Sequence, residues 1–208
     1  MATSATYAVV DIGSNTMRLS VYVIDEGRID IMFHKKEMAG LANYVDVSGR
    51  LDKRGVRRAI DVLETFRSTL AHLGVTHVFP FATASLRNIT NTAEVVEAIE
   101  KNTGYRVDVI SGIDEAKLDF YGAMSAVDLS EGLLVDIGGG STELVAFRKR
   151  REKSADSIPA GSLALYRDQV SGLLPNAREG RRIVDTVEAS LDRLQMPDGV
   201  DMSVVCGV

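Results

Sequence analysis

Cysteine, aromatic residues and long apolar runs are all scarce in this chain of 208 residues. Its one cysteine, Cys206, excludes an intramolecular disulfide and a cysteine-based zinc site, and it is typical of a reducing compartment. The three histidines, His34, His72 and His77, occur in no metal-ligand spacing. No apolar run approaches the roughly 18 residues of a membrane-spanning helix, and the first residues lack the basic and apolar regions of a signal peptide. We therefore expect a cytoplasmic protein with no membrane partner.

The charge balance limits the classes of partner. The formal net charge is -5, which disfavours a general affinity for duplex nucleic acid or anionic membranes. With 45% hydrophobic and 25% charged residues, the composition is that of an ordinary globular protein. If the substrate is a polyanion, its charge must therefore be met locally by backbone N–H groups, a few Arg and Lys side chains, and a metal ion.

An internal repeat organises the chain. Residues 10–19 align without gaps on residues 135–144, at an offset of 136 − 11 = 125, and five of the ten positions are identical. Short repeats of 20–50 residues indicate solenoids, whereas this offset indicates a duplicated domain. We predict a first unit over residues 1–125 and a second over residues 126–208.

The pattern of the first unit predicts three strands followed by alternating helices and strands, βββαβαβα. Asn91 and Glu94 have the spacing of a capping box, and Gly104 ends the helix that they begin. The expected strands are Tyr7–Ile12, Met17–Ile24, Arg28–Phe33, His77–Ala82 and Arg106–Ile110, and the expected helices are Asp52–Leu73, Asn91–Ile99 and Asp114–Ala126.

The second unit restarts in the same way. If the two units are equivalent, the second lacks a final helix, strand and helix, and we expect a C-terminal truncation. Its expected strands are Gly132–Ile137, Ser141–Phe147, Ser154–Ile158 and Ser203–Cys206, and its expected helix is Arg181–Leu194.

Each repeat places an Asp at the end of a strand, followed by a glycine-containing turn into a second strand. Glycines let backbone N–H groups approach phosphate oxygens closely, and an Asp there can hold a hydrated Mg²⁺. One such turn could be only a tight hairpin with an Asx hydrogen bond. Two copies at equivalent places predict a phosphate clamp with two sides.

These motifs resemble those of the exopolyphosphatase/guanosine pentaphosphate phosphatase family, part of the superfamily of actin, sugar kinases and heat-shock chaperones. The resemblance rests on the two turns that begin at Asp11 and Asp136, and on the stretches 82–87 and 110–116. It runs from about Tyr7 to the C-terminus. It implies an α/β fold of duplicated ribonuclease-H-like (actin-like ATPase) units, each a mixed sheet flanked by helices, with the second unit incomplete.

The resemblance also implies roles for four acids. Glu115 matches the catalytic glutamate, which would deprotonate the attacking water. Asp136 and Glu143 match acids that act around the metal and the water, and Asp11 matches the metal-binding acid of the first turn. Less specific interpretations stay open, because Glu115 also suits the first turn of a helix and Glu143 could face outward. We expect Asp114 to be a capping or solvated acid.

The remaining predicted site residues would bind phosphate. Arg87 resembles a basic residue facing the phosphate chain, although a surface charge is an equal alternative, and Arg18 is a weaker candidate. The basic run 148–153 could follow a polyanion or could be a solvated hairpin turn. The predicted phosphate donors of the turns are Gly13, Ser14, Asn15, Thr16, Gly138, Gly139, Gly140, Ser141 and Thr142.

Two segments depart from the family pattern. Ile113 stands where a polar or acidic residue is usual, and residues 39–45 lack the expected basic and glycine pattern. The second departure leaves substrate contacts there undefined.

The function predicted from the sequence is phosphohydrolysis. The enzyme would release the terminal phosphate of polyphosphate or pppGpp with Mg²⁺ or another divalent cation, and the resemblance is compatible with a homodimer. Three alternatives use the same turns: an ATP-dependent kinase or ATPase, a non-catalytic polyphosphate or (p)ppGpp sensor, and an actin-like assembly protein.

Overall fold

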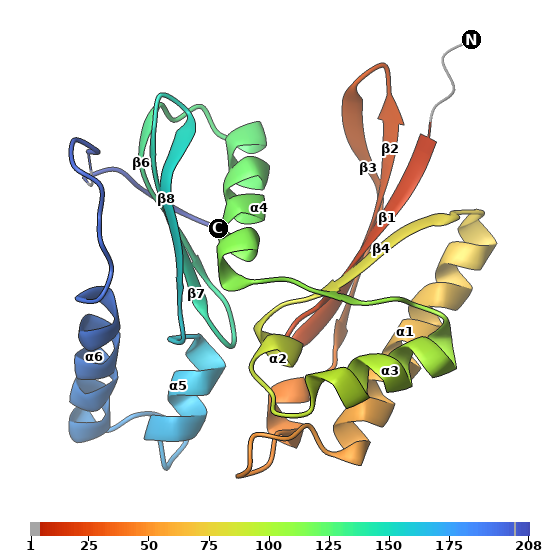
Figure 1. Cartoon of the computed structure of the whole chain (residues 1–208), viewed down its shortest axis with the longest axis horizontal. Coiled ribbons are helices and arrows are strands. Elements are labelled where there is room, and N and C mark those ends of the chain that lie inside the picture. Colours follow the sequence, from red (N-terminus) through yellow and green to blue (C-terminus); the bar gives the residue numbers. More distant parts are fainter. Residues whose placement is uncertain (1–4, 202) are drawn as a thin grey trace. The chain divides into compact units, whose positions relative to one another are not determined.

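The chain folds into two compact units, Met1–Ile110 and Ser111–Val208, each built on a sheet of parallel and antiparallel strands (Figure 1). The structure is a computed structural model that describes residues 5–201 and 203–208. Within that part of the chain, every helix is too short or too polar to span a lipid bilayer.

The sheet of the first unit has five strands in the order β3-β2-β1-β4-β5. The first three strands along the chain form an antiparallel meander, whereas β4 and β5 run parallel to β1. The order of strands along the chain agrees with the prediction, although β3 is longer than predicted. The strands are β1 (Ala5–Ile12), β2 (Thr16–Asp25), β3 (Arg28–Met38), β4 (His77–Ala82) and β5 (Asp108–Val109).

Helices cover the sheet of the first unit and bury its apolar residues. In α1, the residues at helical spacing from Ile60 to Leu70 are buried, with Phe66 fully so. They pack with alternate residues of β1 and β2 and with Val95 and Ile99 of α3 in one core. The helical elements are η1 (Leu41–Tyr44), α1 (Lys53–Leu73), α2 (Ala84–Arg87) and α3 (Thr92–Thr103), of which η1 and α2 were not predicted.

The predicted capping box at α3 is wrong. The Asn91 side chain makes no cap hydrogen bond to α3, although Gly104 ends the helix as predicted. Instead, Asn91 is 7% exposed and bonds both backbone groups of Leu51, accepting from its N–H at 2.9 Å and donating to its carbonyl at 3.1 Å. Glu94 pairs with Arg50 at 2.7 Å. The loop before α1 lies beside the start of α3, and the backbone N–H and C=O of Leu51 in this loop need partners. The primary amide of Asn91 both accepts and donates, so it satisfies both groups, whereas a helix cap would use only its oxygen.

The sheet of the second unit repeats the pattern of the first with four strands, in the order β8-β7-β6-β9. Again three strands form an antiparallel meander, and the fourth runs parallel to the first. The pairing Asp11–Arg18 in the first unit corresponds to Asp136–Glu143 in the second, as the repeat offset requires. The strands are β6 (Glu131–Ile137), β7 (Thr142–Arg148), β8 (Arg151–Ile158) and β9 (Val205–Gly207).

Both faces of the second sheet are covered. Ala116, Phe120 and Met124 of α4 pack with Leu134, Val145 and Phe147 in one cluster. A second cluster joins Leu144 and Ile158 to Leu165 and Val187 of the two other helices. These helices are α4 (Gly112–Ala126), α5 (Ser162–Gln169) and α6 (Ala177–Leu191), and α5 was not predicted.

The compact units divide before α4, whereas the repeat in the sequence suggests a division after it. The helix packs with Phe147 and Leu134 of the second sheet, so its apolar face belongs to the second core. The predicted boundary at residues 125 and 126 stays a prediction about how far each repeat extends.

The substitution Asn91→Asp distinguishes the observed bonds of Asn91 to Leu51 from the predicted helix cap. Aspartate is as good an N-cap as asparagine, but it cannot donate to the Leu51 carbonyl. We therefore expect the free energy of unfolding to fall by about 1–3 kcal/mol, measured by urea denaturation. The control is Asn176→Asp at α6, where a complete capping box is present and little change is expected. Equal stability of the two variants would contradict the assignment.

Candidate functional site

The first turn joins β1 to β2, and its carbonyl oxygens point into the protein. The Gly13 amide donates to the Thr16 carbonyl at 3.2 Å, and a Cβ at Gly13 would lie 2.7 Å from the same oxygen, which explains the glycine. The carbonyls of Ser14 and Asn15 accept amide hydrogen bonds of 2.7–3.0 Å from the segment 39–42. This segment leads into η1.

The second turn repeats this arrangement. The Gly138 amide donates to the Ser141 carbonyl at 3.0 Å, which is the bond of the first turn moved by the repeat offset. The carbonyls of Gly138 and Gly139 accept hydrogen bonds of 2.9–3.0 Å from the amides of residues 162–164, at the start of α5. Gly161 approaches the turn so closely that a Cβ there would lie 2.5 Å from the backbone of Gly139.

Because the carbonyls of each turn face inward, the amides are the groups that each turn offers to a ligand. Among the described residues, no backbone carbonyl accepts a hydrogen bond from the amides of Ser14, Asn15, Gly139 or Gly140. Successive backbone N–H groups of this kind form anion-binding concavities. The two turns therefore share an arrangement of amides that suits an anion.

Thr142 differs from the other predicted donors. Its hydroxyl donates to the Ala160 carbonyl at 2.8 Å, and the residue is 7% exposed. The hydroxyl proton thus fastens the turn to the segment that precedes α5. We assign Thr142 a structural role in the turn.

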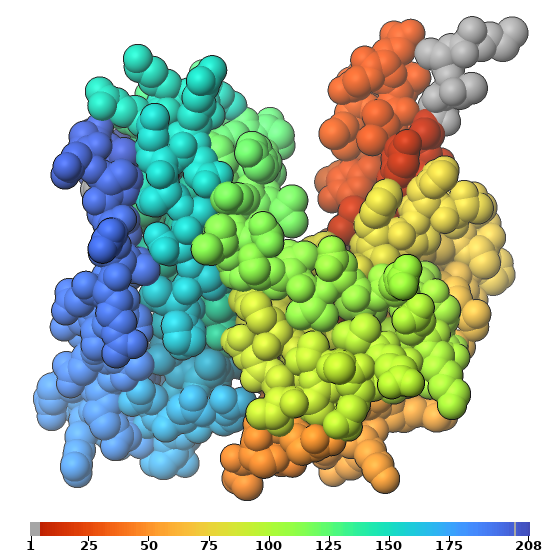
Figure 2. All heavy atoms as spheres, viewed as in Figure 1, coloured from red at the N-terminus to blue at the C-terminus, as the bar shows by residue number. Residues whose placement is uncertain are grey.

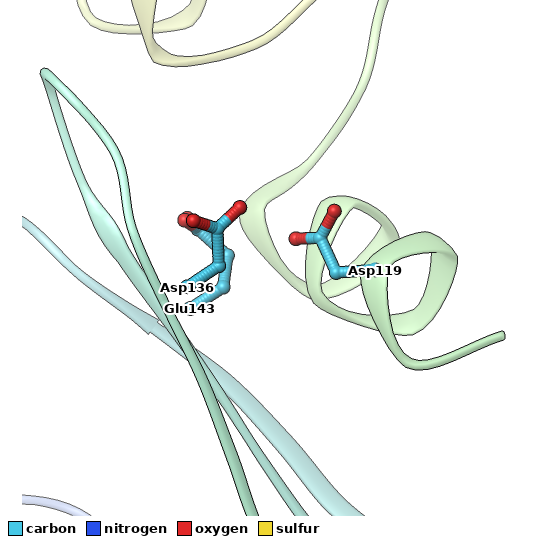
Figure 3. A group of neighbouring side chains, drawn as sticks. All are labelled: Asp119, Asp136 and Glu143. Carbon is cyan, nitrogen blue, oxygen red and sulfur yellow. The ribbon is translucent and has the colours of Figure 1, made fainter. Parts of the chain in front are cut away.

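Three carboxylates meet beside the second turn. Asp136 and Glu143 are paired across β6 and β7, and directly opposed residues of an antiparallel pair point to the same face. Asp119 of α4 lies over this face, and Figure 3 shows its carboxylate directed toward the other two. One oxygen from each of the three acids lies within 4.8 Å of the others.

Glu143 is the most enclosed of these acids. It is 1% exposed, which excludes the interpretation that it faces outward into solvent. Its Oε1 accepts a hydrogen bond of 2.7 Å from the Ser157 hydroxyl of the neighbouring strand β8. Ser157 therefore fixes the orientation of this carboxylate.

The N-terminus of α4 carries two further acids, Asp114 and Glu115. Ser111 caps the helix by accepting from the Asp114 amide at 3.1 Å, and its hydroxyl donates to the Asp114 carboxylate at 2.6 Å, so Asp114 is a capping acid, as predicted. Glu115 lies in the first turn and is half-buried. It precedes Asp119 by four residues, and such residues lie on one face of a helix. Glu115 is thus on the side of α4 that carries Asp119.

The predicted residues of the first unit are distributed over three elements. Asp11 is half-buried and is the second-last residue of β1, and Arg18 is exposed on β2. Arg87 lies in the short helix α2 and donates to the Ile110 carbonyl at 3.1 Å. Ser85 of the same helix is buried and donates to the Ile12 carbonyl, which ties α2 to the first turn. The predicted placement of these residues opposite the second turn stays a prediction.

The acidic cluster fits a divalent cation. Carboxylate oxygens are the ligands that Mg²⁺ prefers, and this ion usually combines one or two carboxylates with several waters at about 2.0–2.1 Å. A spacing of up to 4.8 Å between oxygens suits an ion that keeps part of its hydration. Asp136, Glu143 and Asp119 are the residues of the second unit that could hold it.

Comparison with known proteins identifies the family. Residues 20–204 match the sequence profile described as the Ppx/GppA phosphatase family. The chain belongs to this family. A Ppx/GppA relative from Mycobacterium tuberculosis, named exopolyphosphatase 1, is 32% identical over 187 residues, which are 88% of this chain and 53% of that protein. The chain thus spans about half the length of this relative.

Two further similarities agree. A Vibrio cholerae protein named guanosine-5'-triphosphate,3'-diphosphate pyrophosphatase is 32% identical over 159 residues, covering 76% of this chain and 32% of that protein. The crystal structure of an exopolyphosphatase from Cytophaga hutchinsonii superposes with a TM-score of 0.84 at 27% identity, over 89% of this chain and 60% of that one. The predicted actin-like α/β class of the Ppx/GppA fold is confirmed.

Sequence reasoning did not select Asp119. A signal was available, because Asp119 follows Glu115 by four residues on the helix predicted from Asp114. Nothing in the sequence showed that this face of the helix packs over Asp136 and Glu143.

The close approach of Gly161 to the second turn leads to a testable prediction. Gly161→Ala forces its new Cβ against the backbone of Gly139, so we expect a loss of about 1–3 kcal/mol in unfolding free energy. The amide NMR signals of residues 138–140 should also shift. The control is Gly180→Ala on α6, where a Cβ meets nothing within 4 Å and stability should rise by up to about 1 kcal/mol. Unshifted signals for the turn in Gly161→Ala would contradict the prediction.

Proposed function

We propose that this Ppx/GppA protein is a phosphohydrolase that releases the terminal phosphate of a phosphoanhydride chain, inorganic polyphosphate or pppGpp. One observation carries the proposal: Asp119, Asp136 and Glu143 bring their oxygens within 4.8 Å of one another, on the side of α4 that carries Glu115. The names of the relatives, an exopolyphosphatase and a pyrophosphatase of guanosine-5'-triphosphate,3'-diphosphate, support this class of substrate.

In the proposed mechanism, each group has one task. Glu115 accepts a proton from the water that attacks the terminal phosphorus, as a general base. The amides of Gly139 and Gly140 bind the oxygens of the phosphate being transferred. Asp136, Glu143 and Asp119 would hold a Mg²⁺ ion, which would supply positive charge against the charge that develops on those oxygens.

This division of tasks suits phosphoryl transfer. Its transition state is loose, so catalysis depends on positioning and charge neutralisation rather than on a covalent intermediate. Backbone amides fixed by the inward-facing carbonyls, and a carboxylate fixed by Ser157, are positioned before the substrate arrives. Such preorganisation avoids reorganising dipoles during the reaction.

Glu115→Gln tests the general base. Loss of the proton acceptor should reduce turnover on polyphosphate, pppGpp or both by about two to four orders of magnitude, with substrate binding nearly unchanged. Phosphate release is measured with each substrate and with ATP. The control is the neighbouring Asp114→Asn, which weakens only the helix cap and should change turnover by less than about threefold. Wild-type turnover in Glu115→Gln would refute the role of this residue.

Ser157→Ala tests the orientation of Glu143. Removing a hydrogen bond that orients a metal ligand typically weakens metal binding by about 10–100-fold, so we expect the Mg²⁺ concentration for half-maximal activity to rise. Titration calorimetry with Mg²⁺ alone measures the same loss without substrate, and Ser157→Thr should restore it. The control is Ser154→Ala, also on β8. Equal Mg²⁺ affinity in Ser157→Ala and Ser154→Ala would count against the cation site.

A further inference from the structure

The hairpin between β7 and β8 carries a second charged site that the proposed mechanism does not use. Four exposed basic side chains, Arg148, Lys149, Arg151 and Lys153, line a cavity of about 610 Å³. Figure 2 shows the teal atoms of this hairpin at the surface. A volume of this size lies in the range of small-molecule and cofactor sites.

The backbone of the hairpin gathers these side chains. Arg148 and Arg151 are opposed across the two strands, and the pairing shifts by one residue between Ala146 and Phe147. Phe147 packs under α4, so Arg148, which follows it, projects to the other face of the sheet. Lys149 lies in the turn, with a φ of 54°. The result is a group of like charges at one end of the sheet.

Most of this charge is not balanced within the described part of the chain. Arg148 lies 3.3 Å from Glu131, whereas no described acid lies within ion-pair distance of Lys149, Arg151 or Lys153. Like charges that face each other across strands are destabilising. The protein as a whole has a net charge of -5, so this concentration of cations is a local feature.

The remaining cation of the run has a different use. Arg150 bonds the Met124 and Val127 carbonyls and the Asp128 carboxylate at the C-terminal end of α4. It therefore fastens the hairpin to the helix, and a guanidinium is favoured at that end of a helix. The structure separates one anchoring arginine from four cations that face the cavity.

We propose that this cavity binds a linear inorganic polyphosphate chain. Ammonium and guanidinium groups are the side chains that bind phosphate oxygens most strongly. Among the described residues, none that lines the cavity is aromatic. Single-stranded nucleic acids usually stack their bases on aromatic side chains in such grooves. The site thus matches a polyanion without bases.

The site is distinct from the catalytic acids. Glu143 and Arg148 lie on the same strand and are separated by five residues, which is roughly 17 Å. Their side chains project to opposite faces of the sheet. The site would therefore bind a part of the polyphosphate chain that is remote from the reacting phosphate, or it would bind a second polyphosphate molecule. Its role as a substrate-holding site, though not its binding of polyphosphate, rests on the proposed function.

A triple substitution removes the three unbalanced cations. It leaves in place Arg150, which anchors the hairpin, and Arg148, which pairs with Glu131. It combines Lys149→Asn, Arg151→Gln and Lys153→Gln, because asparagine tolerates the positive φ of the turn. The control removes exposed charge elsewhere in the second unit, with Arg178→Gln and Arg181→Gln on α6. Thermal unfolding confirms that both variants fold as the wild type does.

Binding is measured by titration calorimetry with long-chain polyphosphate and with tripolyphosphate, over a series of salt concentrations. We expect the triple variant to bind the long chain at least about tenfold more weakly. Its dependence of log K on log salt should be shallower by about 2, because each neutralised phosphate contributes a slope of about -0.7 on a single-stranded polyanion. Tripolyphosphate binding should change much less, and the α6 control should resemble the wild type.

Two results would overturn the proposal. One is equal loss of affinity in the triple variant and the α6 control, which would show a general charge effect. The other is binding of single-stranded DNA of matched charge as tightly as polyphosphate, with an affinity that the triple substitution lowers to the same extent. Phosphate release by the same proteins is measured separately. If the wild type binds polyphosphate through the hairpin but releases no phosphate, the proposed hydrolase function is refuted and the binding site is retained.

Discussion

The chemistry proposed for the second unit depends on three carboxylates that the fold holds close together. The oxygens of Asp119, Asp136 and Glu143 lie within 4.8 Å of one another, and Glu143 is 1% exposed. Charges brought together and removed from water are costly unless opposite charge offsets them. Sheet pairing, the packing of α4 and the Ser157 hydroxyl hold these acids close together. The proposed divalent cation would supply such positive charge, which links this part of the fold to the proposed phosphate chemistry.

Duplication explains how one backbone design supplies two chemical surfaces. Both turns use the same amide-to-carbonyl bond, from Gly13 to Thr16 and from Gly138 to Ser141, and both direct their carbonyls toward a following helical segment. The positions after the turns have diverged, because Arg18 in one copy corresponds to Glu143 in the other. One strand position thus presents an exposed cation in the first unit and a buried anion in the second.

The sequence predicted the repeat and the order of strands along the chain, because alternation and glycine turns are local signals. It did not predict Asp119 as a member of the cluster, since that depends on which face of α4 packs against the second sheet. It assigned Asn91 to a helix cap, although a loop 40 residues earlier in the chain uses the side chain instead. The short helix α5, whose amides fix the second turn, has too little periodicity to be recognised. The errors therefore fall where contacts distant in sequence override local preference.

The conformation of the second turn depends on a second segment of the chain. Its backbone is shaped by residues 160–164, which accept the Thr142 hydroxyl, leave room at Gly161 and bond the turn carbonyls. Transplanting the glycine-rich loop alone into another scaffold would leave those carbonyls free to compete for water and would blur the direction of the amides. A designer who wished to move this turn would have to graft two segments together, with a glycine retained at their point of contact.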